Sequence, residues 1–158
     1  MTEAPLSYRR AAESDVAAIV KLLAADPLGS QRERDVEPLP HEYLEAFRSI
    51  DGDANQLLIL ALRSEAIVGV LQLTLIPSLT YQGGWRGQIE GVRIAEEARS
   101  EGVGRRLIEQ AISLARERRC HMVQLTTDKR RPRALAFYEK LGFVASHEGM
   151  KLKLDPDG

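Results

Sequence analysis

The stretch from Gly87 to Arg119, GQIEGVRIAEEARSEGVGRRLIEQAISLARERR, decides the fold. It contains an apolar run from Ile89 to Ile94 that is typical of a strand, and a charged loop over residues 95–101 follows. After this loop, apolar or small residues recur at the spacing of one helix face: Gly104, Leu107, Ile108, Ala111, Ile112 and Ala115. The predicted order is therefore a strand, a glycine-containing loop and a long amphipathic helix.

A helix that begins directly after a glycine loop offers a binding site for an anion. The first turn of a helix presents free N–H groups and the positive end of the helix dipole. Gly102 and Gly104 leave the backbone accessible, and Arg99 and Arg105 place positive charge beside it. These features favour a phosphate or pyrophosphate ligand. A turn that uses glycine only for its backbone freedom is the alternative.

Two common phosphate motifs do not fit this loop. A P-loop is excluded because no Gly-Lys-Ser or Gly-Lys-Thr follows the glycines, and a dinucleotide fingerprint would need a third glycine where Leu107 stands. The pattern present is Arg99-x-x-Gly102-x-Gly104. It resembles the acetyl-CoA-binding motif of the GNAT N-acetyltransferase superfamily, whose common form is Arg or Gln, two residues, Gly, one residue, and Gly or Ala.

A second motif carries the same resemblance. Residues Ala134 to Phe143, ALAFYEKLGF, are similar to the closing helix and strand of GNAT enzymes. The resemblance extends over nearly the whole chain, so we expect a single N-acetyltransferase domain over residues 1–158 with a core of about 6–154. It implies an α/β fold with a twisted, largely antiparallel mixed sheet. In such a fold a central parallel pair of strands splays apart and helices cover both faces.

Hydrophobic patterning predicts the remaining elements. A helix follows Glu13 and stops at Asp26-Pro27-Leu28-Gly29, and a surface loop is expected over Ser30–Leu39. Further elements are expected along the chain: a strand at Leu6–Arg10, a helix at His41–Ile50, a hairpin of Gln56–Leu62 and Ile67–Ile76, a strand at Met122–Thr126, a helix at Arg133–Leu141, and a closing antiparallel pair at Phe143–His147 and Met150–Leu154.

Composition narrows the class of protein. With 158 residues, a formal net charge of −1 and 44% apolar residues, the chain is typical of a soluble globular domain, and we expect neither a nucleic-acid nor a membrane partner. A basic loop at Lys129, Arg130 and Arg131 is too short to carry nucleic-acid binding. The single cysteine and the absence of an apolar N-terminal segment indicate a cytoplasmic protein.

The resemblance also implies which residues hold acetyl-CoA as cosubstrate. The backbone of Val92, Arg93 and Ile94 would pair with the pantetheine arm, and the loop would hold the pyrophosphate through Arg99, Ser100, Glu101, Gly102, Val103, Gly104 and Arg105. Phe137 would pack near the acetyl end. Many family members carry an asparagine where this chain has Arg131. Arg131 or Arg130 could instead contact a coenzyme phosphate, and a solvated loop is the alternative.

Two residues are candidates for catalysis. Family members often place a tyrosine beside the coenzyme sulfur, which makes Tyr138 the candidate general acid, with plain packing as its alternative. Glu90 is the candidate base, because a carboxylate within an apolar strand is costly unless it is paired or faces a cleft, where its pKa could rise toward neutrality. A structural ion pair with Arg93 or Arg86 and a water relay are its alternatives.

Other reactive residue types give weaker signals. Cys120 follows two arginines at a helix-to-strand junction and is expected to be a packed small residue rather than a nucleophile. No Cys or His cluster has the spacing of a metal site, so no metal is expected.

The predicted function is acetyl transfer from acetyl-CoA to a primary amine of a small molecule or peptide by direct attack. A non-catalytic acetyl-CoA sensor or assembly domain is the alternative. Acidic residues at Glu33, Asp35, Glu37, Glu42 and Glu45 are compatible with a cationic acceptor and equally with a solvated helix face. A homodimer is expected because it is common in the family that the chain resembles.

Overall fold

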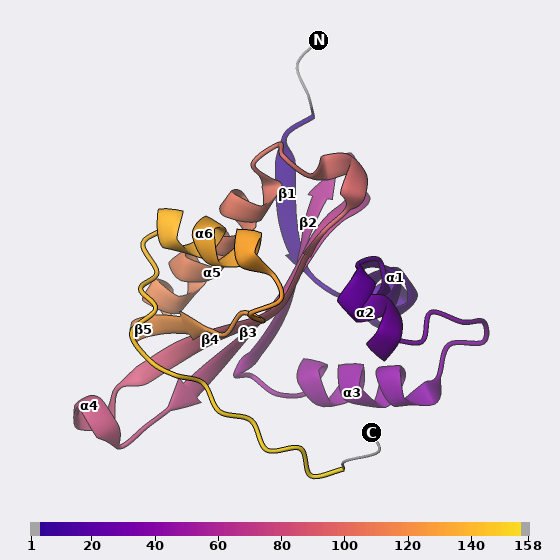
Figure 1. Cartoon of the computed structure of the whole chain (residues 1–158). Coiled ribbons are helices and arrows are strands. Elements are labelled where there is room, and N and C mark those ends of the chain that lie inside the picture. Colours follow the sequence, from indigo (N-terminus) through magenta and orange to yellow (C-terminus); the bar gives the residue numbers. More distant parts are fainter. Residues whose placement is uncertain (1–3, 156–158) are drawn as a thin grey trace. The chain divides into compact units, whose positions relative to one another are not determined.

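The computed structural model describes residues 4–155 and has two compact units, the first ending at Leu125 and the second beginning at Thr126 (Figure 1). The predicted single domain over 1–158 therefore includes a few terminal residues outside the described range. The first unit contains a five-stranded sheet in the order β1-β2-β3-β4-β5. Its strands are β1 (Leu6–Arg10), β2 (Gln56–Arg63), β3 (Ala66–Pro77), β4 (Trp85–Ile94) and β5 (Cys120–Leu125).

The sheet is mixed, as the resemblance implies. β1, β2, β3 and β4 pair antiparallel in sequence order, whereas β4 and β5 pair in parallel through the long α5 (Val103–Glu117). The predicted β2–β3 hairpin closes through a two-residue turn. Its two residues, Ser64 and Glu65, both have the positive φ angles that such a tight turn requires. The predicted α/β fold with a largely antiparallel sheet is thus confirmed.

Helix α5 covers one face of the sheet through its apolar stripe. The stripe is fully buried at Val103, Leu107, Ile108, Ala111 and Ala115. Two glycines on the sheet allow the helix to come close: a Cβ at Gly69 would lie 3.3 Å from Leu107 Cδ2, and one at Gly87 would lie 3.3 Å from Ala115 Cβ. Burying each large apolar side chain of this layer stabilises the fold by roughly 1.5–3 kcal/mol.

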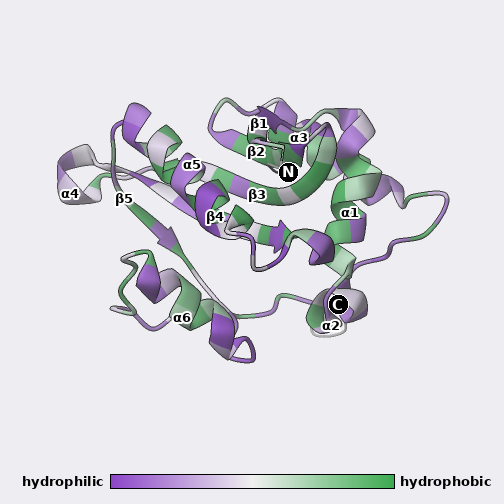
Figure 2. Ribbon diagram, turned by 90° about the horizontal axis from the view of Figure 1, so that it is seen from above, coloured by the Kyte–Doolittle hydropathy of each residue, from purple (hydrophilic) through white to green (hydrophobic). Residues whose placement is uncertain are grey.

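The opposite face carries α1 (Val16–Ala24) and α3 (His41–Asp51). Their buried side chains form a second core with strand residues, made of Ala11, Val16, Ile19, Val20, Phe47, Leu60, Leu62 and Val70. Figure 2 shows hydrophobic residues concentrated along α1, β2 and β3, in agreement with this core. A 3-10 turn at Glu13–Asp15 leads into α1.

Three short elements differ from the sequence prediction. Residues expected to end a helix and start a loop instead form α2 (Pro27–Arg32), because Asp26 accepts the Gly29 amide at 2.9 Å as N-cap and Pro27 stands at the first helical position. α4 (Thr80–Gly83) and a 3-10 turn at Glu96–Ala98 lie in stretches expected to be turn and loop.

The second unit contains α6 (Pro132–Lys140), close to its predicted range. The predicted closing strands at Phe143–His147 and Met150–Leu154 are wrong: within the described range, residues 143–155 contain neither strand nor helix. The alternating pattern that suggested strands is present, but no backbone ladder pairs with it, and Met150, Leu152 and Leu154 are 94%, 86% and 92% exposed.

Candidate functional site

The parallel pair β4–β5 separates where the resemblance implies a cosubstrate. Pairing runs from Trp85 with Cys120 to Ile89 with Leu125, where it stops. β4 nevertheless continues to Ile94, and its other edge stays paired with β3, with Arg93 opposite Val70 and Ile94 opposite Gly69. The backbone of β4 from residue 90 to residue 94 therefore offers an edge that β5 does not occupy.

A β-bulge shapes this end of β4. Between the pairs Gln72–Glu90 and Val70–Arg93, β4 contains one more residue than β3. Gly91 lies in the bulge with φ +63°, a conformation that glycine adopts at little cost. The bulge leaves the Glu90 side chain exposed, so the candidate base is reachable from solvent.

The ion pairs near Glu90 differ from those weighed for it. Arg93 Nε lies 3.7 Å from Asp26 Oδ1, and Arg93 also donates through Nη1 to the Val92 carbonyl at 2.7 Å. The structure thus brings Arg93 to the N-cap of α2. Among residues 4–155 no salt bridge joins Glu90 to Arg93 or Arg86.

The loop before α5 presents backbone amides. Helical bonding begins with the Arg106 amide, which donates to the Gly102 carbonyl at 3.1 Å, so the amides that precede it in the first turn remain available. Ser100 and Gly102 have positive φ angles of 66° and 78°. A Cβ at Gly102 would meet nothing within 4 Å, so the space beside this amide is open.

Charged side chains flank this loop. Arg99 Nε donates to the Ile94 carbonyl at 3.4 Å, which ties the loop to the end of β4. Glu101 accepts from Arg63 Nη1 at 2.6 Å, and Arg105 donates to Glu109 at 2.9 Å on the exposed face of α5. The predicted pyrophosphate residues Arg99 to Arg105 are thus brought together with Val92, Arg93 and Ile94 in the first unit.

The remaining predicted site residues lie in the second unit. On α6, the ring of Tyr138 makes edge-on contacts with Phe137 at 5.1 Å and with Phe143 at 5.8 Å between ring centroids. In the preceding loop, two side-chain hydrogen bonds and one backbone hydrogen bond from Arg130 hold the pKa of Asp128 well below its usual range. Arg130 is therefore engaged within its own loop, and Arg131 starts α6 as its N-cap.

Cys120 is the first residue of β5 and is partly buried. Burial raises the pKa of its thiol, against a smaller opposing effect of Arg118. A raised pKa lowers the thiolate fraction, which argues against a nucleophilic role. Among residues 4–155 no group of three or more His, Cys, Asp or Glu side chains is placed to hold a metal ion. None of the helices in this range is both long and apolar enough to span a membrane.

A polar row crosses the sheet that sequence reasoning missed. Strand register aligns Gln56 with Thr74, Thr74 with Gln88 and Gln88 with Gln124. Gln56 Oε1 accepts from Thr74 Oγ1 at 2.9 Å, and Gln124 Nε2 donates to Gln88 Oε1 at 3.0 Å, so these side chains share one face. The row adjoins Glu90. Its signal in the sequence was the alternation of polar residues at Gln72 and Thr74 of β3 and at Arg86, Gln88 and Glu90 of β4.

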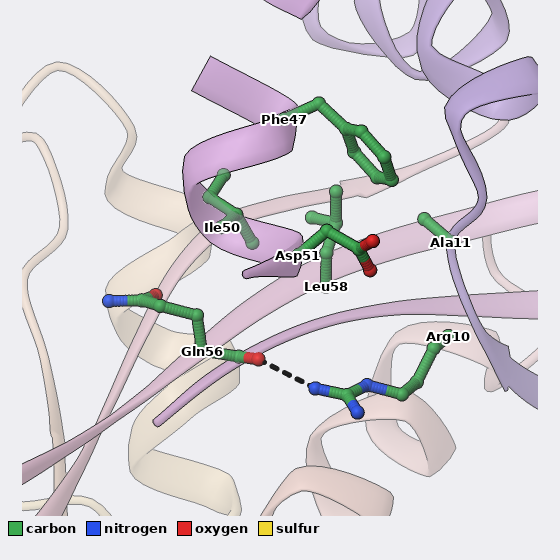
Figure 3. A pocket seen from close by; sticks show the side chains of 7 residues that line it. All are labelled: Arg10, Ala11, Phe47, Ile50, Asp51, Gln56 and Leu58. Atoms are coloured by element: carbon green, nitrogen blue, oxygen red, sulfur yellow. Dashed lines mark hydrogen bonds between the residues drawn. The ribbon is translucent and has the colours of Figure 1, made fainter. Parts of the chain in front are cut away.

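Two hollows lie between the helices and this face. The smaller, of about 10 Å³, has walls from α3, the end of β1 and the start of β2 (Figure 3). There Phe47, Ile50 and Leu58 form the apolar side, and Arg10 donates to the Gln56 carbonyl at 2.9 Å. A larger hollow of about 110 Å³ shares these three apolar residues and also includes Gln72.

The mixed sheet with an open β4 edge and helices on both faces is the fold that the resemblance to the GNAT family implies. Comparison with known families agrees: the model of the acetyltransferase (GNAT) family matches residues 17–143. Because this match spans most of the chain, the protein belongs to the GNAT acetyltransferase family.

Individual relatives show how the likeness is distributed. A segment of 88 residues, 56% of the chain, is 36% identical to glucosamine 6-phosphate N-acetyltransferase of Trypanosoma brucei brucei and spans 58% of that enzyme. A crystal structure of a transcriptional regulator from Bacillus halodurans C-125 is 53% identical, with a TM-score of 0.92, and covers 95% of this chain and 100% of that one. A predicted acetyltransferase from Clostridium acetobutylicum, crystallised with acetyl-CoA, is 21% identical with a TM-score of 0.73 and covers 95% and 97% of the two chains.

The residues of the first unit fit the coenzyme that this family uses. A pantetheine arm carries amide groups that need backbone partners, and the edge of β4 beyond Ile89 provides them. A pyrophosphate needs several N–H donors with no bulky side chain beside them, and the start of α5 at Gly102 provides these donors. We therefore find the chemistry of the donor set consistent with acetyl-CoA.

Proposed function

We propose that this protein is an N-acetyltransferase that moves an acetyl group from acetyl-CoA to a primary amine of a small molecule or peptide by direct attack. One observation carries the proposal: the open β4 edge, the exposed Glu90 and the free amides before Arg106 adjoin one another in the first unit. Membership of the acetyltransferase family supports it. The amines named for the relatives are substrates of those proteins and do not identify the acceptor of this one.

Binding would use the backbone more than side chains. The main chain of Val92, Arg93 and Ile94 would hold the pantetheine arm. The loop from Arg99 to Gly104, aided by Arg105, would hold the pyrophosphate, because oriented N–H groups and a helix start bind such an anion at little reorganisation cost. Phe137 and Arg131 are proposed as further contacts of the coenzyme.

Acetyl-CoA supplies an acetyl group activated as a thioester. The carboxylate of Glu90 would accept the proton that the amine must lose, since a free alkylamine is protonated at neutral pH. The amide N–H of Val92 would donate to the thioester oxygen as negative charge develops on it. The Tyr138 hydroxyl would return a proton to the departing sulfur. A water relay in place of Glu90 remains the alternative base.

An acceptor screen on wild type and Tyr138→Phe tests this proposal. Free thiol released from acetyl-CoA is followed over a panel of amines, and we expect turnover on one amine class that falls at least about 100-fold in the variant. Tyr81→Phe is the matched control, because Tyr81 is an exposed tyrosine in α4 of the first unit. Equal turnover in Tyr138→Phe and wild type would remove Tyr138 from the chemistry.

A second candidate is an acetyl-CoA-binding regulator without catalysis. It is favoured by the 53% identical structure, which is described as a transcriptional regulator. Calorimetric binding of acetyl-CoA together with no thiol release on any amine would support this second function over the first.

A further inference from the structure

The larger hollow is apolar on nearly all sides. Its helical walls come from α1 and α3 through Val16, Ile19, Leu23, Tyr43, Phe47 and Ile50. The sheet contributes Leu58 and Gln72. The Tyr43 hydroxyl is already used, since it accepts the Arg34 amide at 2.9 Å and donates to Glu33 at 3.2 Å. Tyr43 therefore offers its ring rather than its hydroxyl to the hollow.

The one polar wall of the hollow leads to Glu90. Gln72 pairs directly with Glu90 across β3 and β4, and side chains opposite each other in such a pair project from the same face of the sheet at close range. Gln72 Nε2 donates to Gln56 Oε1 at 2.9 Å, which fixes the amide plane beside the hollow. Glu90 therefore projects from the same face of the sheet as Gln72, next to the polar end of the hollow.

The charge of this region restricts its occupant. None of the eight lining residues carries a formal charge, and Arg93 is directed to Asp26. An ionised phosphate placed there would lose its hydration without a cationic partner, which is costly. An apolar group would gain by leaving water, and an ammonium group next to it would be attracted to Glu90. The volume of about 110 Å³ is on the scale of the apolar cavities, roughly 150 Å³, that accept a group the size of benzene.

We infer that the acceptor is a primary amine that carries a compact apolar or aromatic group, with this group in the hollow and the nitrogen directed to Glu90. This inference rests on the proposed acetyltransferase function and names its substrate class. The hollow selects against hexosamine phosphates, because none of its eight lining residues is cationic. Gln72 orients the polar end of the acceptor.

Three probe amines test the inference: phenethylamine, ethanolamine and glucosamine 6-phosphate. We expect kcat/KM, measured by thiol release, to be at least about 10-fold higher for phenethylamine than for either other amine, which is the scale of discrimination that an apolar pocket provides. Line broadening of phenethylamine NMR signals by the protein, with coenzyme A present, gives a binding readout independent of turnover.

Filling the hollow tests its location. Leu23→Trp is expected to lower the ratio of kcat/KM for phenethylamine to that for ethanolamine at least about 10-fold. Lys21→Trp places the same side chain on the exposed side of α1 and is expected to leave this ratio unchanged. Circular dichroism melts verify that both variants fold.

The outcomes separate this inference from the proposed function. If the protein acetylates amines but prefers ethanolamine or glucosamine 6-phosphate, or if Leu23→Trp leaves the ratio unchanged, the inference is overturned while the acetyltransferase function stands. If no amine is acetylated, the proposed function fails and the inference fails with it.

Discussion

Asp15 ties the first strand to the first helix with three hydrogen bonds. Its Oδ2 accepts from Arg9 Nη1 and from the Ala12 amide, both at 2.7 Å, and its Oδ1 accepts from Arg9 Nη2 at 3.0 Å. The bond from Arg9 lowers the pKa of Asp15, with help from the Ala12 amide, although desolvation opposes this effect. The site needs the ionised carboxylate, so its contribution to stability depends on pH.

The contribution of ionised Asp15 to the free energy of unfolding is expected to be lost in acid. Because the folded pKa lies below the unfolded value of about 3.9, the stabilisation is present above that value and is lost as pH falls through the folded pKa. Asp15→Asn should lower the free energy of unfolding by about 1–3 kcal/mol at pH 7 and by clearly less at pH 3. Urea denaturation at both pH values measures this difference, and Glu97→Gln, at an exposed position, is the control. A deficit of equal size at both pH values would contradict the assignment.

At the scale of residues, the sequence predicted the motif positions and missed their surroundings. Glu90 and the loop from Arg99 to Arg105 could be proposed as site residues because strand, glycine and helix signals are local. The pairing of Arg93 with Asp26 joins residues far apart in the chain, and no local sequence pattern predicts it. The polar row likewise depends on strand register, which single-sequence patterns specify only loosely.

The start of α5 is set by backbone conformation. Gly102 is the N-cap in the left-handed region, and Ser100, two residues earlier, takes the same region at greater cost because it has a Cβ. No side-chain hydrogen bond caps this helix. The loop conformation, rather than a capping side chain, therefore decides where the helix begins.

Substitutions at these two positions should change the free energy of unfolding differently. Gly102→Ala should lower the free energy of unfolding by about 1–2 kcal/mol through backbone strain alone, since an added Cβ meets no neighbour. Ser100→Gly relieves the same strain and should leave stability equal to wild type or raised by up to about 1 kcal/mol. Thermal and urea denaturation of the three proteins measures this order. A Gly102→Ala protein as stable as wild type would show that the loop relaxes to another conformation.

At the scale of elements, periodicity predicted the long segments well and the short ones poorly. α5 and the β2–β3 hairpin carry strong 3.6-residue and apolar patterns, and both are confirmed. α2 was missed because Asp26-Pro27 can end one helix or begin the next. In the structure Asp26 caps α2, and Gly29 packs closely against the end of α1, where an added Cβ would lie 1.9 Å from the Leu23 carbonyl oxygen. The prediction of two closing strands was wrong because alternating apolar residues indicate one face of a strand but do not provide a neighbouring strand for it to pair with.

At the scale of the whole molecule, the C-terminal stretch presents an apolar stripe of Met150, Leu152 and Leu154. These side chains alternate with Lys151 and Lys153, so an extended chain would place the apolar residues on one side and the charges on the other. All three apolar residues are exposed. Burying each of them would be worth roughly 1.5–3 kcal/mol, which is a driving force for association.

A homodimer is expected from the family resemblance, and this stripe is a candidate interface for it. Replacing all three residues by serine removes the apolar area but keeps the lysines, so the dimer should dissociate at least about 100-fold more readily, since each lost side chain costs more than about 1 kcal/mol. Sedimentation equilibrium over a range of protein concentrations measures both dissociation constants. Lys151→Ser with Lys153→Ser is the matched control, because it alters the same stretch and keeps the stripe. A wild-type protein that stays monomeric at all concentrations, or a serine variant that dimerises as tightly as wild type, would refute the proposed interface.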